Sequence, residues 1–338
     1  MRRRPRRRSP AWAAAPLPHG FGSNRAGAVR SALGVLWLLD GGLQFQPFMY
    51  THGFPRLLAS VETGQPAWLR SMLAWGAGLA GAHLPVWNTL FALTQVALGV
   101  GILLRPTVKL ALLASFGWVL VVWWFGEGLG QLLTGTASPL GGAPGAVLLY
   151  ALLGLVVWPG DRPGGLVGPL GARLLWGVLW AGMASLWLLG PNSGKNATRD
   201  AIAAAPAGIG PVDSLQRHVA ELASGKGHPI AVALATLSFA IGVAVVLNLR
   251  ARWFLVLAIS LSVGYWVIGQ GLGGLATGSA TDPNAAPLFI LLAVAVSTAL
   301  PGPAAARRRR LYAWTGRPNP FRRSPTAGST STASATSA

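Results

Sequence analysis

An internal repeat constrains the fold of this chain more than any other feature of its sequence. The stretch GEGLGQLLTGTASPLGGAP at residues 126–144 returns as GQGLGGLATGSATDPNAAP at residues 269–287, an offset of 143 residues (269 − 126). The same offset, without gaps, superposes further pairs: Trp37 on Trp180, Gly99 on Gly242, and Trp123 on Trp266. Because the matching positions extend far beyond one loop, a whole unit was duplicated. We therefore expect two halves of similar structure.

The composition indicates that both halves lie in a lipid bilayer. Hydrophobic residues make up 52% of the 338 residues and charged residues only 10%, whereas a typical soluble domain carries about 25% charged residues. Apolar segments that can cross a hydrocarbon core of roughly 30 Å recur in both halves. They lie at residues 29–48, 85–104, 110–125 and 143–158, and again at 174–189, 229–247, 253–268 and 286–300. The sequence thus predicts an all-α polytopic membrane protein with about eight transmembrane helices, in two tandem four-helix bundles (29–160 and 172–301).

The basic residues predict how these helices are oriented. With eight spans, 21 of the 27 Lys and Arg residues fall on one side, and the long connections at residues 49–84 and 190–228 hold the other six. The side richer in Lys and Arg is the cytoplasmic side. Both termini are therefore expected in the cytoplasm, and the localisation is a multi-pass protein of the cell membrane. Since each half has an even number of spans, the two repeats should insert in parallel.

The two ends of the chain hold most of its positive charge. The net charge is +19, and 15 of the 27 basic residues lie before residue 31 or after residue 306. We expect the basic segment 1–28 and the tail 302–338, basic and then rich in Ser and Thr, to be disordered. Because the interior carries no basic face, no specific nucleic-acid partner is expected. The lipid bilayer is the expected surrounding.

One acidic residue, Asp40, stands about eleven residues into the first predicted span, close to mid-membrane. A charge at that depth costs at least about 2.5 kcal/mol, so its side chain should face the bundle interior and have a partner or a proton. The candidate pocket, at the outer end of the first half, consists of Asp40, Gln44, Gln46 and Glu127, with the weaker candidates His52 or His83 above it. Such a cluster can relay protons, polarise a quinone carbonyl or bind a small polar solute. The alternative is that Asp40 only caps a buried helix contact and Glu127 lies in headgroup water.

The second half lacks these acids at the matching positions. The offset of 143 places Met183 on Asp40, Trp187 on Gln44 and Gln270 on Glu127. Polar function is therefore predicted to be confined to the first half.

Several kinds of chemistry are disfavoured. The chain has no cysteine, which excludes disulfides, thiolate metal sites and a catalytic thiol. Its His residues have no short ligand spacing, so no metal site is expected. The Gly-rich stretch lacks the strand and helix context of a nucleotide loop, and we interpret it as an irregular outer loop or a close helix contact. The aromatic residues are expected to be mostly interfacial anchors rather than the lining of a cofactor site. No catalytic residue set and no cofactor site is visible.

The stretch FALTQVALGVGILLRPTVKLALLASFGWVL at residues 91–120, with Gly99, Gly101, Arg105 and Ala111, resembles the DoxX and DoxD-like membrane family. The resemblance implies that each half is one four-helix unit of that family. It also implies an association with thiosulfate:quinone oxidoreductase and other membrane redox assemblies, in which such proteins are small subunits beside a soluble partner. The expected function is therefore a membrane-anchor, quinone-interacting subunit of an oxidoreductase. A small-solute carrier and a non-catalytic membrane scaffold are the alternatives.

Overall fold

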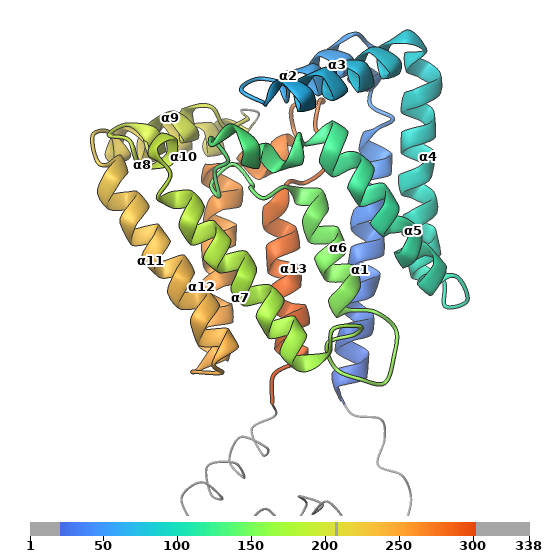
Figure 1. Cartoon of the computed structure of the whole chain (residues 1–338), viewed down its shortest axis with the longest axis vertical. Helices are drawn as coiled ribbons and strands as arrows, with labels where there is room; N and C mark the ends of the chain where they lie inside the picture. The colour runs from blue at the N-terminus through green and yellow to red at the C-terminus, as the bar shows by residue number, and fades with distance from the viewer. Residues whose placement is uncertain (1–20, 207–208, 302–338) are drawn as a thin grey trace, which may run out of the picture. The chain divides into compact units, whose positions relative to one another are not determined.

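The computed structural model describes residues 21–206 and 209–301, and this part of the chain is all-helical (Figure 1). The predicted tail 302–338 lies outside the described residues, as do residues 1–20. Helix α1 begins at Phe21, so the prediction of disorder is wrong for residues 21–28. A helix satisfies its own backbone hydrogen bonds, which allows α1 to extend beyond its apolar segment.

Every predicted span coincides with a helix. In the first half these are α1 (Phe21–Leu43), α4 (Leu84–Leu103), α5 (Val108–Val121), which continues into a π-helix (Val122–Gly126), and α6 (Ala146–Val156). In the second half they are α7 (Gly168–Trp187), α11 (Gly227–Val246), α12 (Ala251–Ile268) and α13 (Ala285–Thr298). Four helices of the described chain are long and apolar enough to cross a membrane: Leu84–Leu103, Val108–Gly126, Gly227–Val246 and Ala251–Ile268. The protein is thus multi-pass by length and composition.

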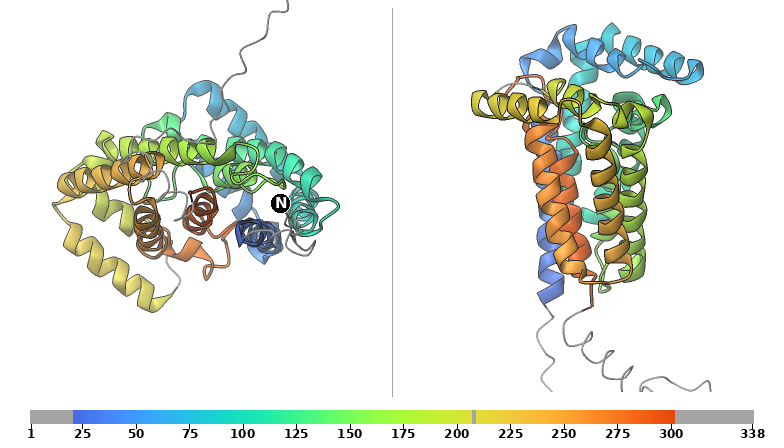
Figure 2. Two further views of the ribbon diagram at one scale, coloured as in Figure 1. Left: turned by 90° about the horizontal axis from the view of Figure 1, so that it is seen from below. Right: turned by 90° about the vertical axis from the view of Figure 1, so that its left-hand side faces the viewer.

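The long connections also form helices. The first contains a 3₁₀ turn (Pro47–Tyr50), α2 (Gly53–Ser60) and α3 (Ala67–Ala82), and the second contains α8 (Gly190–Ser193), α9 (Ala197–Ala203) and α10 (Gly210–Ala223). All of them lie at one end of the long helices (Figures 1 and 2). The two halves therefore place their connections on the same face of the bundle.

Equivalent helices pack through equivalent glycines. In the first half α1 packs against α4, where a Cβ on Gly99 would lie 2.8 Å from the carbonyl oxygen of Gly34. In the second half α7 packs against α11, where a Cβ on Gly242 would lie 3.2 Å from the carbonyl oxygen of Gly177. Small residues let helix backbones approach this closely. Between the halves α6 packs against α13, and one hydrophobic core runs through both.

The offset of 143 residues between equivalent positions changes within the Gly-rich loops. The indole of Trp123 donates to the carbonyl of Pro144 (3.0 Å), and that of Trp266 donates to the carbonyl of Pro283 (2.9 Å). The tryptophans differ by 143 positions and the prolines by 139, so the second loop is four residues shorter. The ungapped alignment of Pro287 with Pro144 is therefore wrong. A loop tolerates such a deletion because few packing contacts fix its length.

Each Gly-rich loop also reaches the other half. The side-chain amide of Gln46 donates to the carbonyl of Ala280 (3.0 Å), and that of Asn192 donates to the carbonyl of Ala137 (2.7 Å). Ala137 and Ala280 are equivalent by the offset of 143. This reciprocal crossing brings second-half residues to the site described next.

Candidate functional site

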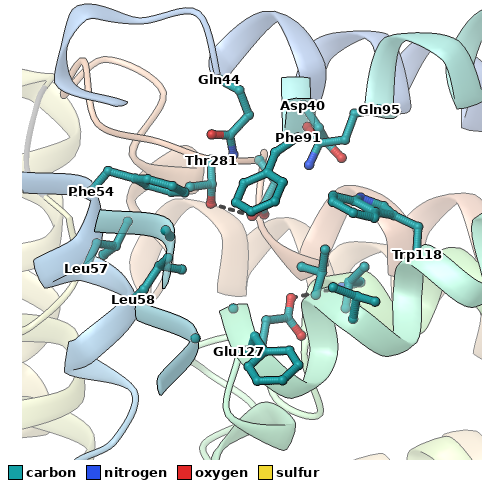
Figure 3. Close-up of a pocket in the computed structure, with 18 of the residues that line it drawn as sticks. Asp40, Gln44, Phe54, Leu57, Leu58, Phe91, Gln95, Trp118, Glu127 and Thr281 are labelled. Carbon is teal, nitrogen blue, oxygen red and sulfur yellow. Dashed lines mark hydrogen bonds between the residues drawn. The ribbon is translucent and has the colours of Figure 1, made fainter. Parts of the chain in front are cut away.

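A cavity of about 450 Å³ lies within the first half (Figure 3). Side chains of α1 to α6 form its walls, and the second half contributes Thr281 and Asp282 from its loop. Most of the lining is aromatic or aliphatic. Of the described residues around it, three are carboxylic acids (Asp40, Glu127 and Asp282) and none is Lys, Arg or His. The cavity is thus mostly apolar, and its polar portion contains three acids and no base.

Asp40 lies on the face of α1 that is turned to the bundle interior, as predicted. Its side chain is only 3% exposed, and its Oδ2 accepts a hydrogen bond from the hydroxyl of Tyr150 on α6 (2.5 Å). The Tyr150 ring rests against Trp37, one turn before Asp40, at a centroid distance of 4.3 Å. The other carboxylate oxygen, Oδ1, is buried and has no hydrogen-bond partner. Asp40 therefore keeps one acceptor free at the cavity.

Glu127 follows the π-helix and turns back toward the start of α6. Its Oε1 accepts from the backbone N–H of Val147 (2.9 Å), which satisfies an otherwise unpaired donor at a helix N-terminus. Gly145 makes this approach feasible, because it has φ +114° and a Cβ there would collide with Oε2. Burial and then the charge of Asp282 raise the pKa of Glu127 to about 8, against the hydrogen bond from Val147. Glu127 therefore holds a proton at neutral pH.

Asp282 is the acid that sequence reasoning missed. It lies in the loop before α13 and takes hydrogen bonds from the Asn284 backbone N–H (2.7 Å) and the Thr281 hydroxyl (2.8 Å). Burial raises the pKa of Asp282 above its usual value, and these two hydrogen bonds oppose the increase. The prediction that polar function is confined to the first half is thus wrong in this respect. No pattern in the sequence signals the loop crossing that carries Asp282 there.

Two glutamines complete the polar portion. Gln44, which was predicted, and Gln95 of α4, which was not, are 5% and 7% exposed and line the cavity. The side-chain oxygen of each is buried without a partner, as is Oε2 of Glu127. An intramembrane Gln at position 95 was a readable signal, since polar residues in spans face the interior.

Three other candidates are not in the cavity lining. Gln46 holds the second-half loop through Ala280, as described above. His52 precedes α2 and His83 joins α3 to α4, and both side chains are exposed. The expectation of a histidine above the pocket is wrong, because α2 and α3 lie there instead and cover the cavity with Phe54, Leu57 and other apolar side chains.

Aromatic residues that were expected to be interfacial anchors form much of the wall. Phe91 lies 5.7 Å from Trp118 and 6.2 Å from Trp87, and Trp75 lies 6.1 Å from Phe125, as ring-centroid distances. All five line the cavity. They come from α3, α4, α5 and the π-helix, so only the tertiary structure brings them together.

The second half carries larger side chains at three positions that correspond to the cavity lining. Met183, at the position of Asp40, and Trp187, at that of Gln44, are fully buried. Trp187 packs against Tyr265 (6.0 Å), which stands at the position of Val122 in the cavity lining. The polar side chains of Asp40 and Gln44 thus have apolar or aromatic counterparts in the second half.

The site has no arrangement suited to a metal ion. In the described ranges, no group of three His, Cys, Asp or Glu side chains is placed to hold one. Comparisons with known protein families, with curated proteins and with solved structures find no match for this chain. The proposed function therefore rests on the geometry and chemistry of the cavity.

Proposed function

We propose that the chain spans the membrane eight times, as two parallel four-helix repeats with both termini in the cytoplasm. The four apolar helices of spanning length give half of these crossings. The other four would be α1, α7 and the shorter α6 and α13, of 11 and 14 residues. A helix of 11 residues covers only about 16 Å, so the loops before α6 and α13 would enter the bilayer. The side chains of Glu127 and Gln270 accept hydrogen bonds from the backbone there, and irregular backbone at that depth requires such partners.

We also propose that the first repeat binds a small lipid-soluble molecule and that the second repeat has a structural role. The observation that carries the proposal is the contrast between the repeats. One has a cavity of about 450 Å³ with unpartnered buried oxygens, and the other has Met183, Trp187 and Tyr265 at the equivalent positions.

The energetics support a ligand. A buried polar group without a partner costs about 1–3 kcal/mol, and Asp40, Gln44, Gln95 and Glu127 each have one buried oxygen without a partner. In the second repeat Met183 and Trp187 replace Asp40 and Gln44, and the side-chain oxygen of Gln270, at the position of Glu127, accepts a hydrogen bond from Ala286. A cavity of this volume lies in the usual range of small-molecule sites, which combine apolar walls with a few polar groups. A bound molecule with donors would satisfy these oxygens.

The test introduces into the first repeat two side chains that the second repeat has at equivalent positions, those of Trp187 and Tyr265. Wild type and the variants Gln44→Trp and Val122→Tyr are purified in mild detergent, and the lipid-soluble molecules extracted with them are identified by mass spectrometry. Val178→Tyr, on the exposed face of α7, is the matched control. We expect wild type and the control to retain a molecule that Gln44→Trp and Val122→Tyr both lose. The unfolding midpoints of all three variants should stay close to that of wild type. Equal retention by Gln44→Trp and Val122→Tyr would contradict the proposal.

A quinone-linked redox subunit is the second candidate. It is favoured by the aromatic walls beside Glu127, whose pKa of about 8 allows proton exchange near neutral pH. The indole N–H groups of Trp37 and Trp118 also have no partner and could donate to quinone carbonyls. When bound, a quinone would supply electron transfer, which the side chains themselves lack. A quinone or an oxidoreductase subunit that copurifies with the chain would support this role. Solute uptake into liposomes by the chain alone would favour a carrier.

A further inference from the structure

The cavity lining contains three acids and no base. Asp40 Oδ1, Gln44 Oε1, Gln95 Oε1 and Glu127 Oε2 are buried oxygens without a hydrogen-bond partner. Two of the four oxygens belong to carboxyl groups, and Asp282 adds a third acid. A ligand with a positively charged centre would match these acids.

No countercharge from the protein neutralises these acids. Among the described residues, the single ion pair within salt-bridge distance joins Arg199 and Asp200, both well exposed and outside the cavity lining. Three acids without a base in a low-dielectric site repel one another when ionised. A bound cation would remove this repulsion.

The aromatic walls suit the same kind of ligand. The faces of Trp, Tyr and Phe attract a cation within about 6 Å of the ring centroid, and recognition of quaternary ammonium groups commonly uses several such rings. Here Trp87, Phe91 and Trp118 form a continuous series of ring contacts. Phe91, Trp118 and Glu127 line the same cavity (Figure 3). Apolar side chains of α2 and α3 complete the enclosure and offer no hydrogen bond. A ligand with a cationic centre and an apolar body fits both portions.

We propose that this cavity binds a lipophilic organic cation, an aryl or alkyl ammonium, with its charged centre between the acids and the aromatic rings. The inference rests on the proposed binding function of the first repeat and names its ligand class. The acid that meets the cation must ionise, so binding releases a proton to solvent.

Proton release makes the affinity depend on pH. The titratable groups around Glu127 are Asp40 on α1, Tyr150 on α6 and Asp282 in the second-half loop, and the cavity-lining residues of α2, α3 and α4 add none. For a permanent cation, release of one proton gives up to about tenfold tighter binding per pH unit below the pKa of the acid. Affinity should therefore rise from pH 6 to about 8, the pKa of Glu127, and then level off.

Matched probes of opposite charge test the proposal. Tetraphenylphosphonium, tetraphenylborate and the neutral quinone menadione are titrated into the detergent-purified full chain, with tryptophan fluorescence and calorimetry as readouts. We expect the cation to bind at least about tenfold more tightly than the anion at pH 8. Glu127→Gln should weaken the cation about tenfold and flatten its pH dependence, because Gln270 shows that an amide oxygen can accept the same backbone hydrogen bond. Glu221→Gln, at an exposed site on α10, should change neither.

The other possible results distinguish a wrong ligand class from a wrong binding function. If menadione or the anion binds more tightly than the cation, or if Glu127→Gln binds the cation as wild type does, the cation assignment is wrong and the binding function stands. If no probe binds the folded chain, the binding function fails together with the ligand class.

Discussion

Replacing Glu127 with glutamine should stabilise the folded protein at alkaline pH and leave it unchanged at acid pH. Burial raises the pKa of Glu127 from 4.5 to about 8. Between these values the folded state holds a proton that the unfolded state has released. The free energy of unfolding then falls as pH rises, by about 1.36 kcal/mol per pH unit and about 5 kcal/mol in total. Glutamine holds no such proton, so the variant escapes this loss.

The expected difference is smaller than that upper value. Glu127 is only partly buried, which reduces the penalty for charging its side chain. We therefore expect Glu127→Gln to exceed wild type by about 2–3 kcal/mol at pH 8.5 and by about zero at pH 4.5. The hydrogen bond to Val147 should survive, since the amide oxygen of Gln270 accepts the equivalent bond from Ala286 at 3.2 Å.

Denaturant unfolding in mild detergent, followed by tryptophan fluorescence, measures this difference at several pH values. Glu221→Gln serves as the control, because it removes an exposed acid of the same type on α10. Its curve should follow that of wild type. If Glu127→Gln and wild type lose stability in parallel between pH 5 and 8.5, Glu127 is not a buried acid with a raised pKa.

Three further predictions use other parts of the chain. Gly130→Ala should destabilise the fold by about 3 kcal/mol or more, because Gly130 has φ +62° and a Cβ there would collide with the carbonyl of Pro144. In the same unfolding assay Gly135→Ala should cost only about 1 kcal/mol, because Gly135 has a similar φ of +73° but open space around it. Tyr150→Phe removes a hydrogen bond to a buried carboxyl group and should cost about 2 kcal/mol; an unchanged unfolding midpoint would argue against that bond. In this cysteine-free chain, Arg70→Cys should react with an impermeant thiol reagent in intact cells and Arg162→Cys should not, and the reverse pattern would overturn the proposed topology.

The sequence by itself determined the repeated helical plan. The offset of 143 predicted that α11 would repeat α4, and the two helices begin and end at equivalent residues (Leu84–Leu103 and Gly227–Val246). Apolar segments predicted where the long helices lie, because length and hydrophobicity are local properties. Asp40 and Gln44 were expected to face the interior, since a polar group in an apolar helix does so, and both are buried and line the cavity.

Only the tertiary structure decided what surrounds that pocket. Asp282 is more than 150 positions away from Glu127 along the chain, and it arrives through a loop that crosses between the halves. Trp75 and Trp118 are of the residue type that anchors a helix at the membrane interface, and only the packing of α3 against the π-helix after α5 brings both to one cavity. The four-residue shortening of the second loop also escaped an ungapped comparison. The path of a loop, and which side chains meet in a cavity, depend on contacts between segments that are distant in the sequence. Periodicity and hydrophobicity describe only the surroundings of each segment by itself.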